Sequence, residues 1–240
     1  MKLEVLFSPV QADELFFTGK TTVVIDVLRA SSTIITALTN GAKEVVPVAT
    51  VEFAVKVSGG IFGGQTLLGG ERNTKKIEGF ALGNSPSEYT KEIVSGKSIV
   101  FYSTNGSRAI VKAKYSKNLF ICSFNNMKAL AKQLKKLNED VIILCSGNNN
   151  FFSLEDSVCA GMLLNELESG NKNVQLNDSS TCAITLFKSF GKNILKMLSE
   201  TDHGKVLIEN GFKDDLKACA ELDNTDVIPF YSGNALKVLK

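Results

Sequence analysis

The chain has 240 residues, enough for one large domain or two tightly joined lobes. Hydrophobic residues make up 44% of it and charged residues 22%, which is the balance of a globular protein and excludes a disordered chain. The 27 Lys and Arg against 25 Asp and Glu leave a net charge of +2. This balance argues against a nucleic-acid binder, because such proteins carry a clustered basic excess.

The five cysteines are too scattered for a structural staple. Their number is odd and no two are close enough for a thiolate zinc motif, which argues against a disulfide framework and a zinc site. The N-terminal MKLEVLFSPV has no signal-peptide core, and no stretch approaches the roughly 18 apolar residues of a membrane span. We therefore expect a cytoplasmic protein with reduced thiols and no membrane association.

Short apolar, β-branched runs alternate with helical patterns along the chain. Strands are expected at 3–7, 22–27, 44–48, 66–68, 98–102, 119–122 and 141–145, with a last one at 226–231. Helices are expected at 31–39, 125–137, 153–168 and 178–190, with shorter ones up to residue 222. This alternation predicts an α/β layered fold with a parallel or mixed sheet. The segment 123–125 is the expected boundary between an N-terminal lobe, 1–124, and a C-terminal lobe, 125–240.

Polar segments follow four of these strands, where ligands collect in open α/β sheets. They lie at 26–33, 69–86, 103–108 and 146–156. The chain has only three arginines among its 27 cations, and Arg29, Arg72 and Arg108 all fall in these segments. A guanidinium grips phosphate, sulfonate or carboxylate through two donors, which an ammonium cannot copy. We predict that at least two of them bind an anionic ligand; the alternative is ion pairing with Asp or Glu.

Two carboxylates stand out in these segments. Asp26 ends a strand, so it is a candidate metal ligand or general base, or else a cap for the helix that starts near Ala30. Glu71 lies between a Gly-Gly pair and Arg72. A hard cation such as Mg²⁺ needs oxygen ligands of this type, whereas the alternative is a local contact with Arg72.

Glu155 and Asp156 are more ambiguous candidates. Ser153 followed by Asp156 fits a capping box before an apolar helix, which would explain Asp156 without a catalytic role. His203 is the only histidine, so no site can rest on several of them. It falls in the first turn of an expected helix, where we expect an exposed structural role, with general acid as the alternative.

Two asparagines complete the candidate set. Asn84 precedes Ser-Pro-Ser-Glu, which has the order of a helix start, so Asn84 is the better functional candidate there. Asn105 lies in Thr-Asn-Gly, which could form a nest of backbone N–H groups around an anion, or a hairpin turn. The helical pattern that follows favours a strand–loop–helix. No Walker loop, GxGxxG or thiolate-phosphatase motif is present.

The motifs together resemble those of a known family. DVLRASST, LLGGERNTKKIEGFALGNSPSEY, STNGSRAI, CSGNNNFFSLEDSVCAG and the later HG followed by GFKDDLKACA are similar to the 2-phosphosulfolactate phosphatase family, over about residues 3 to 230. The resemblance implies a three-layer α/β/α fold with mixed sheets and two similarly built lobes. It also implies a Mg²⁺-dependent hydrolysis of (2R)-2-phospho-3-sulfolactate to (2R)-3-sulfolactate and phosphate, a step toward coenzyme M.

The resemblance gives the candidate residues their expected roles. We expect in-line attack by water, with Asp26, Glu71 and Asp156 as Mg²⁺ ligands and Glu155 as a competing ligand or base. Asp26, Glu155 and Asp156 form the expected catalytic set, and a covalent intermediate on Asp26 or Ser31 stays open. The expected substrate-binding residues are Arg29, Arg72, Arg108, Asn84, Asn105 and Ser31.

Two other functions stay open at this point. The chain could bind phosphorylated hydroxy acids without turning them over, or it could transfer the phosphoryl group to an acceptor other than water. In each case the expected partner is a small anionic phosphorylated molecule, not a nucleic acid or a membrane. A homodimer is a further hypothesis that no residue pattern addresses.

Overall fold

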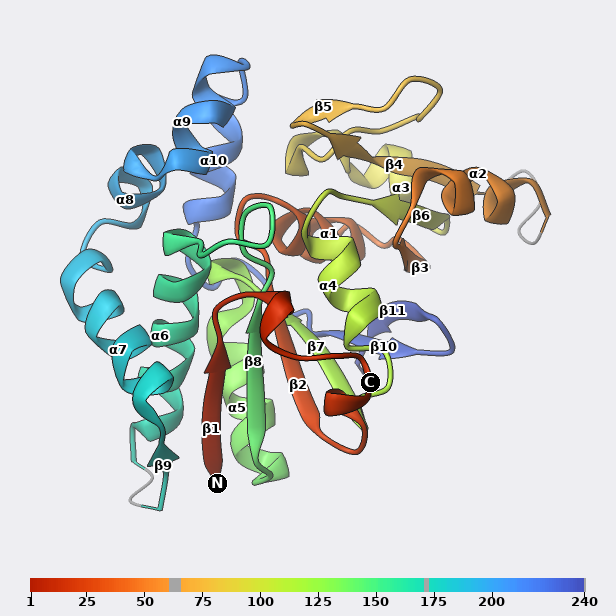
Figure 1. The fold of residues 1–240 in the computed structure, drawn as a ribbon. Coiled ribbons are helices and arrows are strands. Elements are labelled where there is room, and N and C mark those ends of the chain that lie inside the picture. The colour runs from red at the N-terminus through yellow and green to blue at the C-terminus, as the bar shows by residue number, and fades with distance from the viewer. Residues whose placement is uncertain (61–65, 171–172, 240) are drawn as a thin grey trace.

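The computed structural model describes residues 1–60, 66–170 and 173–239, and in these residues one mixed sheet runs through the molecule (Figure 1). Its strand order is β5-β4-β6-β3-β11-β10-β7-β2-β8-β1-β9. The strands are β1 Lys2–Leu6, β2 Thr21–Ile25, β3 Glu44–Val48, β4 Thr66–Arg72, β5 Lys75–Lys76, β6 Ser98–Tyr102, β7 Asn118–Cys122, β8 Val141–Cys145, β9 Gln175–Leu176, β10 Pro229–Ser232 and β11 Ala235–Val238.

Helices cover both faces of this sheet. They are α1 Ala30–Thr39, α2 Val51–Gly60, α3 Lys91–Val94, α4 Gly106–Lys112, α5 Met127–Leu137, α6 Leu154–Glu168, α7 Asp178–Phe190, α8 Ile194–Glu200, α9 Asp202–Glu209 and α10 Lys213–Ala220. In Figure 1 the later helices, α6 to α10, line one side of the molecule, whereas α1 and α4 lie near its centre.

The sheet consists of two parallel halves joined by a hairpin. In one half β7, β2, β8, β1 and β9 run parallel, and in the other β3, β6 and β4 run parallel. The hairpin β10–β11 lies between the halves and pairs antiparallel with β7 on one side and β3 on the other. The carboxyl ends of both parallel halves therefore supply the loops of a single site.

The pleat of the buried strands explains the three layers. Val23 and Ile25 of β2 pack into one apolar cluster with α5, α6 and α7, whereas Val24 packs into a second cluster with α1 and α4. Successive side chains of a strand point to opposite faces, so a strand buried on both sides reads as a continuous apolar run. Each such side chain contributes about 1.5–3 kcal/mol to folding through burial. The α/β fold with a mixed sheet is confirmed.

The expected strands and long helices agree with the structure to within a few residues, but the C-terminus differs. The last strand begins at Pro229 and turns at Gly233 into β11, which the sequence analysis did not predict. The division into lobes 1–124 and 125–240 stays a prediction. The sheet itself runs across that boundary, because β8 pairs with both β1 and β2.

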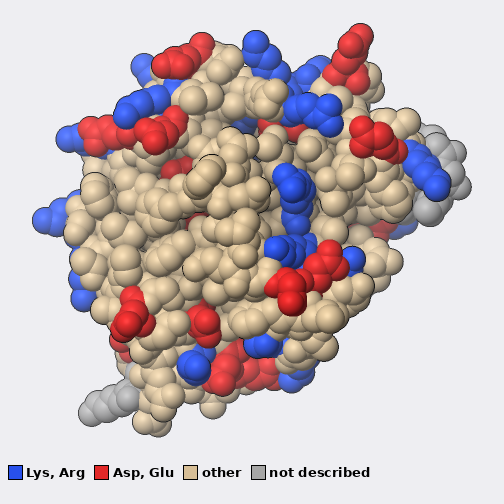
Figure 2. Space-filling view, viewed as in Figure 1, with Lys and Arg blue, Asp and Glu red and all other residues tan. Residues whose placement is uncertain are grey.

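The cysteines, the helices and the surface charge can be compared with what the sequence predicted. All five cysteines are free, and all but Cys182 are buried. None of the helices in the described residues is long and apolar enough to cross a membrane. On the face shown in Figure 2, basic and acidic side chains alternate and form no large patch of a single sign.

Candidate functional site

The loops that follow β2, β4 and β6 meet around a small cavity, which we call the inner cavity. Its volume is about 10 Å³, roughly the space that one water molecule or cation occupies. It is bordered by Asp26, Leu28, Arg29, Glu71, Thr74, Asn84, Ser103, Asn105 and His203. Residues from both parallel halves of the sheet therefore converge here, as the positions of the polar segments predicted.

Two larger cavities adjoin it. The outer cavity, of about 360 Å³, shares Glu71, Thr74, Asn105 and His203 with the inner one, so these four residues form a throat between them. The second, of about 390 Å³, contains Arg108 and also reaches Asn105; we call it the Arg108 cavity. Asn105 borders all three spaces.

Asp26 follows the last residue of β2 and is held by the start of α1. Its Oδ1 accepts a hydrogen bond from the backbone N–H of Ala30 at 3.2 Å, and its own N–H donates to Ser31 Oγ at 2.8 Å. Gly106 opens α4 directly against it, since a Cβ at that position would lie 2.4 Å from Asp26 Oδ2. Burial raises the pKa of Asp26 to about 6, within reach of proton transfer near neutral pH.

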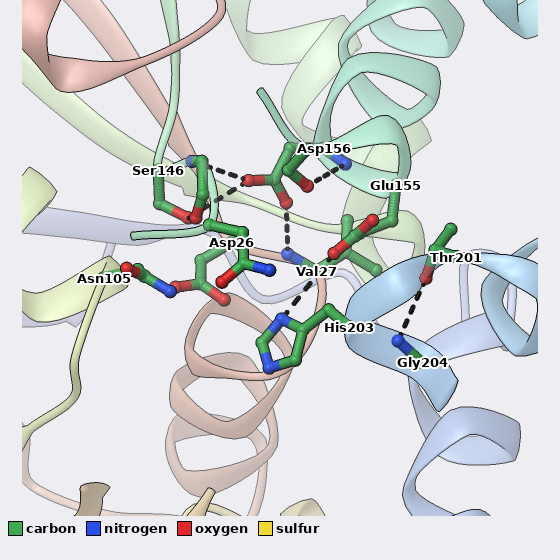
Figure 3. A network of polar contacts seen from close by, with 12 residues as sticks. Asp26, Val27, Asn105, Ser146, Glu155, Asp156, Thr201, His203 and Gly204 are labelled. Atoms are coloured by element: carbon green, nitrogen blue, oxygen red, sulfur yellow. Dashed lines mark hydrogen bonds and ion pairs between the residues drawn. The ribbon is translucent and has the colours of Figure 1, made fainter. Parts of the chain in front are cut away.

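A second carboxylate, Asp156, lies beside Asp26, and both of its oxygens accept hydrogen bonds (Figure 3). We call Asp156 and its partners Val27, Ser146 and Gly147 the Asp156 pocket. Asp156 Oδ1 accepts from the N–H of Val27 at 2.9 Å, and Oδ2 accepts from Ser146 Oγ and from the N–H of Gly147, each at 3.1 Å. Burial, together with the charge of Asp26, raises the pKa of Asp156 well above its usual value. Asp156 does not border the inner cavity; it holds the backbone of Val27, which lies between Asp26 and Leu28 of the cavity wall.

The capping interpretation of this segment is half right. Ser153 Oγ accepts from the N–H of Asp156 at 3.3 Å, so the N-cap of α6 is present. The reciprocal contact of a capping box is replaced by the contacts of the Asp156 side chain with the loops after β2 and β8. In the segment after β6, α4 begins at Gly106, so the strand–loop–helix prediction is confirmed.

His203 requires a correction. An exposed structural role was expected, but the side chain is only 18% exposed and faces the inner and outer cavities. Its Nδ1 lies 3.7 Å from Oε1 of Glu155, and Figure 3 shows this pair beside Asp26. Burial alone lowers the pKa of His203, but the Glu155 carboxylate outweighs that effect and raises it above the usual value. Glu155 therefore stabilises the protonated form of the imidazole at the edge of the site.

Glu71, at the end of β4, faces the throat from the other half of the sheet. Its Oε1 accepts from the N–H of Thr104 at 2.7 Å. Its Oε2 accepts from the N–H of Thr74 at 2.8 Å and from Thr104 Oγ1 at 3.2 Å. These contacts, and not the suggested contact with Arg72, orient the carboxylate.

Arg29 is the most enclosed of the three arginines. Its Nη1 donates to Asp215 Oδ2 at 2.6 Å and to Ser85 Oγ at 3.2 Å, and Nη2 donates to the carbonyl of Thr74 at 2.6 Å. The guanidinium also lies 4.3 Å from the centre of the Phe212 ring. The alternative of structural ion pairing is thus present at Arg29, yet the residue still borders the inner cavity.

The other two arginines lie outside the inner cavity. Arg108 is exposed and borders the Arg108 cavity, which also contains Lys112 and Asn150. Arg72 is exposed, lies 6.0 Å from the centre of the Tyr102 ring, and is not among the residues that border the three cavities. The structure therefore brings Arg29 and Arg108 to connected spaces, whereas Arg72 points elsewhere.

The remaining polar candidates differ in how they are used. Asn84 is buried, and its Oδ1 has no hydrogen-bond partner among the described residues. Asn105 Oδ1 accepts from the N–H of Asn149 at 3.0 Å, which ties the loop after β6 to the loop after β8. Ser31 is fully buried, and its hydroxyl serves the Asp26 backbone and does not border the inner cavity.

The inner cavity is bordered by side chains with oxygen atoms that could bind Mg²⁺. Among residues 1–60, 66–170 and 173–239, no three His, Cys, Asp or Glu side chains are grouped as a metal centre. Asp26 and Glu71 nevertheless border one cavity with the unpartnered Oδ1 of Asn84. Mg²⁺ is commonly held by one or two carboxylates, with water and substrate phosphate as its other ligands. Two carboxylates and a free amide oxygen fit that requirement.

Several residues of the site escaped the sequence analysis. Asp215 looks like an ordinary acid in the first turn of α10, and only the fold places it against Arg29. Thr104 and Thr74 were not singled out, although both contact Glu71. The acidic-first-turn pattern of Asp215 has a local explanation, so no sequence signal distinguishes it from a helix-dipole contact.

Comparison with known proteins gives a consistent result. Residues 7–234 match the family described as 2-phosphosulpholactate phosphatase. The chain is 41% identical over 229 residues to a protein of Symbiobacterium thermophilum, covering 95% of this chain and 97% of that protein. It is 38% identical over 231 residues to a protein of Clostridium beijerinckii, covering 96% and 97%, and 35% identical over 240 residues to one of Clostridium botulinum, covering all of both. Each of these relatives is named a probable 2-phosphosulfolactate phosphatase.

Proposed function

This chain belongs to the 2-phosphosulpholactate phosphatase family, and we propose that it is a Mg²⁺-dependent phosphatase that hydrolyses (2R)-2-phospho-3-sulfolactate to (2R)-3-sulfolactate and phosphate. The observation that carries the proposal is the inner cavity. Two carboxylates, one guanidinium and an amide side chain whose oxygen has no partner among the described residues border a space of about 10 Å³, which shares lining residues with two larger cavities. Phosphoryl transfer requires groups that position the phosphate and neutralise its charge, and these groups can do both.

The three cavities suggest how the charges of the substrate are divided. The reacting phosphoryl group would lie at the throat, near Arg29 and Asn105. The sulfonate would extend toward Arg108, which is exposed and borders an open space of about 390 Å³. A guanidinium suits both anions because two parallel N–H groups match two oxygen atoms.

The metal would be held by Asp26 and Glu71, with Asn84 Oδ1 as a third ligand. When bound, it supplies charge neutralisation at the phosphoryl oxygens. This assignment replaces Asp156 of the expected set with Asn84, because Asn84 borders the inner cavity and Asp156 does not.

The leaving group needs a proton, and His203 is the group that we propose to supply it. Its Nδ1 faces Glu155 at 3.7 Å, and the ring borders the throat. Glu155 favours the protonated form of the imidazole because it raises the pKa of His203. A His203 proton passed to the bridging oxygen would let the sulfolactate leave as an alcohol.

The experiment is a phosphate-release assay on racemic 2-phospho-3-sulfolactate with Mg²⁺ and, in parallel, with EDTA. Phospholactate and p-nitrophenyl phosphate serve as substrates that lack the sulfonate or the hydroxy acid. We expect Mg²⁺-dependent release that stops near half of the racemate. No release from a folded protein with Mg²⁺ present would contradict the proposal.

The same assay separates the two other functions. A non-catalytic binder would be stabilised against heat by these compounds but would release no phosphate. A phosphotransferase would form more sulfolactate when an acceptor alcohol is added than hydrolysis alone yields. No structural feature of the described residues favours either of these over hydrolysis.

A further inference from the structure

Thr74 lies in the turn between β4 and β5 with a backbone conformation that is rare for its residue type. Its φ is +69°, in the left-handed region, where a β-branched side chain is an outlier. Two hydrogen bonds hold it there: its N–H donates to Glu71 Oε2 at 2.8 Å, and its carbonyl accepts from Arg29 Nη2 at 2.6 Å. The backbone is therefore fixed by two residues that border the inner cavity.

This fixed backbone presents a hydroxyl that makes no contact of its own. Thr74 is 9% exposed, and its Oγ1 has no hydrogen-bond partner in the described part of the chain. Neighbouring threonines behave differently, since Thr104 Oγ1 donates to Glu71 and Thr33 Oγ1 donates to the carbonyl of Asn84. Leaving a buried hydroxyl unpaired costs free energy, which a ligand that pairs with it would recover.

The location of the hydroxyl indicates what kind of ligand that is. Thr74 is one of the four residues that border both the inner and the outer cavity. The guanidinium of Arg29 contacts its carbonyl, so positive charge lies on the same side of the throat. Both oxygens of Glu71 already accept hydrogen bonds from other groups, namely the N–H of Thr74 and the N–H and hydroxyl of Thr104. A hydroxyl proton that is not taken up by Glu71 is free to be donated to an anion.

We propose that Thr74 is a catalytic residue whose hydroxyl donates a hydrogen bond to a non-bridging oxygen of the phosphoryl group. The inference rests on the proposed phosphatase function and adds a residue to it. No bond to Thr74 forms or breaks; its proton stays on Oγ1 and stabilises charge on the phosphoryl oxygen. A donor that is held in place before the substrate arrives needs no reorganisation during the reaction, which is what makes such contacts effective.

The test uses three variants of the full chain in the Mg²⁺ phosphate-release assay. Thr74→Val removes the hydroxyl but keeps the branched shape, and Thr74→Ser keeps the hydroxyl. Thr66→Val is the matched control, because Thr66 Oγ1 also has no partner among the described residues yet lies at the opposite end of β4, in register with Ser98. We expect Thr74→Val to lower kcat/KM by about 10- to 100-fold, the range of a hydrogen bond to a charged group. Thr74→Ser and Thr66→Val should stay within about threefold of the unchanged protein.

A second readout separates contact with the phosphoryl group from a structural effect. Inhibition by inorganic phosphate should weaken about tenfold in Thr74→Val, while its urea unfolding midpoint stays equal to that of Thr66→Val. If Thr74→Val fails to fold, Thr74→Ala takes its place with the same expectations. Equal kcat/KM in Thr74→Val and Thr74→Ser would overturn the role of Thr74. Inactivity of the unchanged protein would instead overturn the proposed function, so the two failures are distinguishable.

Discussion

Two polar regions meet at the carboxyl end of β2, and they use their polar atoms in opposite ways. In the Asp156 pocket both carboxylate oxygens accept hydrogen bonds from the chain. At the inner cavity, the buried Thr74 Oγ1 and Asn84 Oδ1 have no hydrogen-bond partner among the described residues. Since buried polar groups are almost always paired, unpaired atoms on residues that border one cavity indicate a place for a ligand, whereas Asp156, which is paired and lies outside that cavity, serves as a scaffold.

The cost of losing a paired contact can be tested at the ion pair between Arg29 and Asp215. Arg29→Ala would leave the Asp215 carboxylate buried without its counter-charge, since both side chains are under 10% exposed. Breaking a buried ion pair by removing one partner costs about 3–5 kcal/mol. We expect urea unfolding to show a loss of that size, with part of it restored in the double variant Arg29→Ala with Asp215→Ala. A loss below about 1 kcal/mol would mean that the pair does not hold α10 to α1.

Substitution of Asp156 should cause the next largest loss in the free energy of unfolding. Asp156→Ala would leave the N–H groups of Val27 and Gly147 and the hydroxyl of Ser146 without their acceptor. We expect a loss of about 2–4 kcal/mol in the free energy of unfolding, because unpaired buried donors cost about 1–3 kcal/mol each and water can satisfy some of them. Asp156→Asn, which keeps one acceptor oxygen, is the control and should lose less. Unfolding free energies equal to that of the unchanged protein would contradict the scaffold role.

Substitution of Asp26, unlike that of Asp156, should increase the free energy of unfolding in protein freed of divalent metal. Its pKa is raised from 3.8 to about 6 by burial, so the folded chain binds its proton more tightly than the unfolded chain. This contribution is fully present below pH 3.8 and is lost as the pH rises through about 6. Asp26→Asn should therefore be about 2–3 kcal/mol more stable than the unchanged protein at pH 7.5 in EDTA, with the gain vanishing near pH 4. A gain that is equal at both pH values would show that ionisation is not its cause.

Arg108 should affect binding without affecting stability. It is exposed and borders an open cavity, so Arg108→Ala should change the free energy of unfolding by less than about 0.5 kcal/mol. We expect KM for phosphosulfolactate to rise about tenfold, and KM for phospholactate, which lacks the sulfonate, to rise less. Arg72→Ala is the matched control, because Arg72 does not border the three cavities. Equal effects of the two variants on KM would contradict the assignment of Arg108 to the sulfonate.

The sequence predicts much of the fold because the strand signals are local. Runs such as 44–48 and 98–102 are β-branched and buried on both faces, and the observed strands β3 and β6 have these bounds. The hairpin β10–β11 was not predicted as a pair, because its role in joining the two sheet halves depends on strands more than 100 residues away in the chain. Pairing over such distances leaves no local pattern.

In the site, too, local features could be predicted from the sequence and long-range contacts could not. That polar loops follow the strands and meet at one end of the sheet was predictable, and Asp26, Glu71 and Asn84 do border one cavity. Which polar groups are already paired was not predictable from residue type. Asp156 is a residue type that can bind a metal but lies outside the inner cavity, whereas Thr74 resembles any turn residue and carries a hydroxyl without a partner in the described part of the chain. Only the three-dimensional contacts distinguish the two.

The measurement that tests the account most directly is the phosphate-release rate of Asp26→Asn on 2-phospho-3-sulfolactate with saturating Mg²⁺, beside its unfolding free energy. The account predicts that kcat falls by at least about 10³-fold, because a carboxylate at the inner cavity is lost, while the fold is as stable as before or more so. A variant that keeps kcat within about tenfold of the unchanged protein would contradict the claim that the inner cavity is where the chemistry takes place.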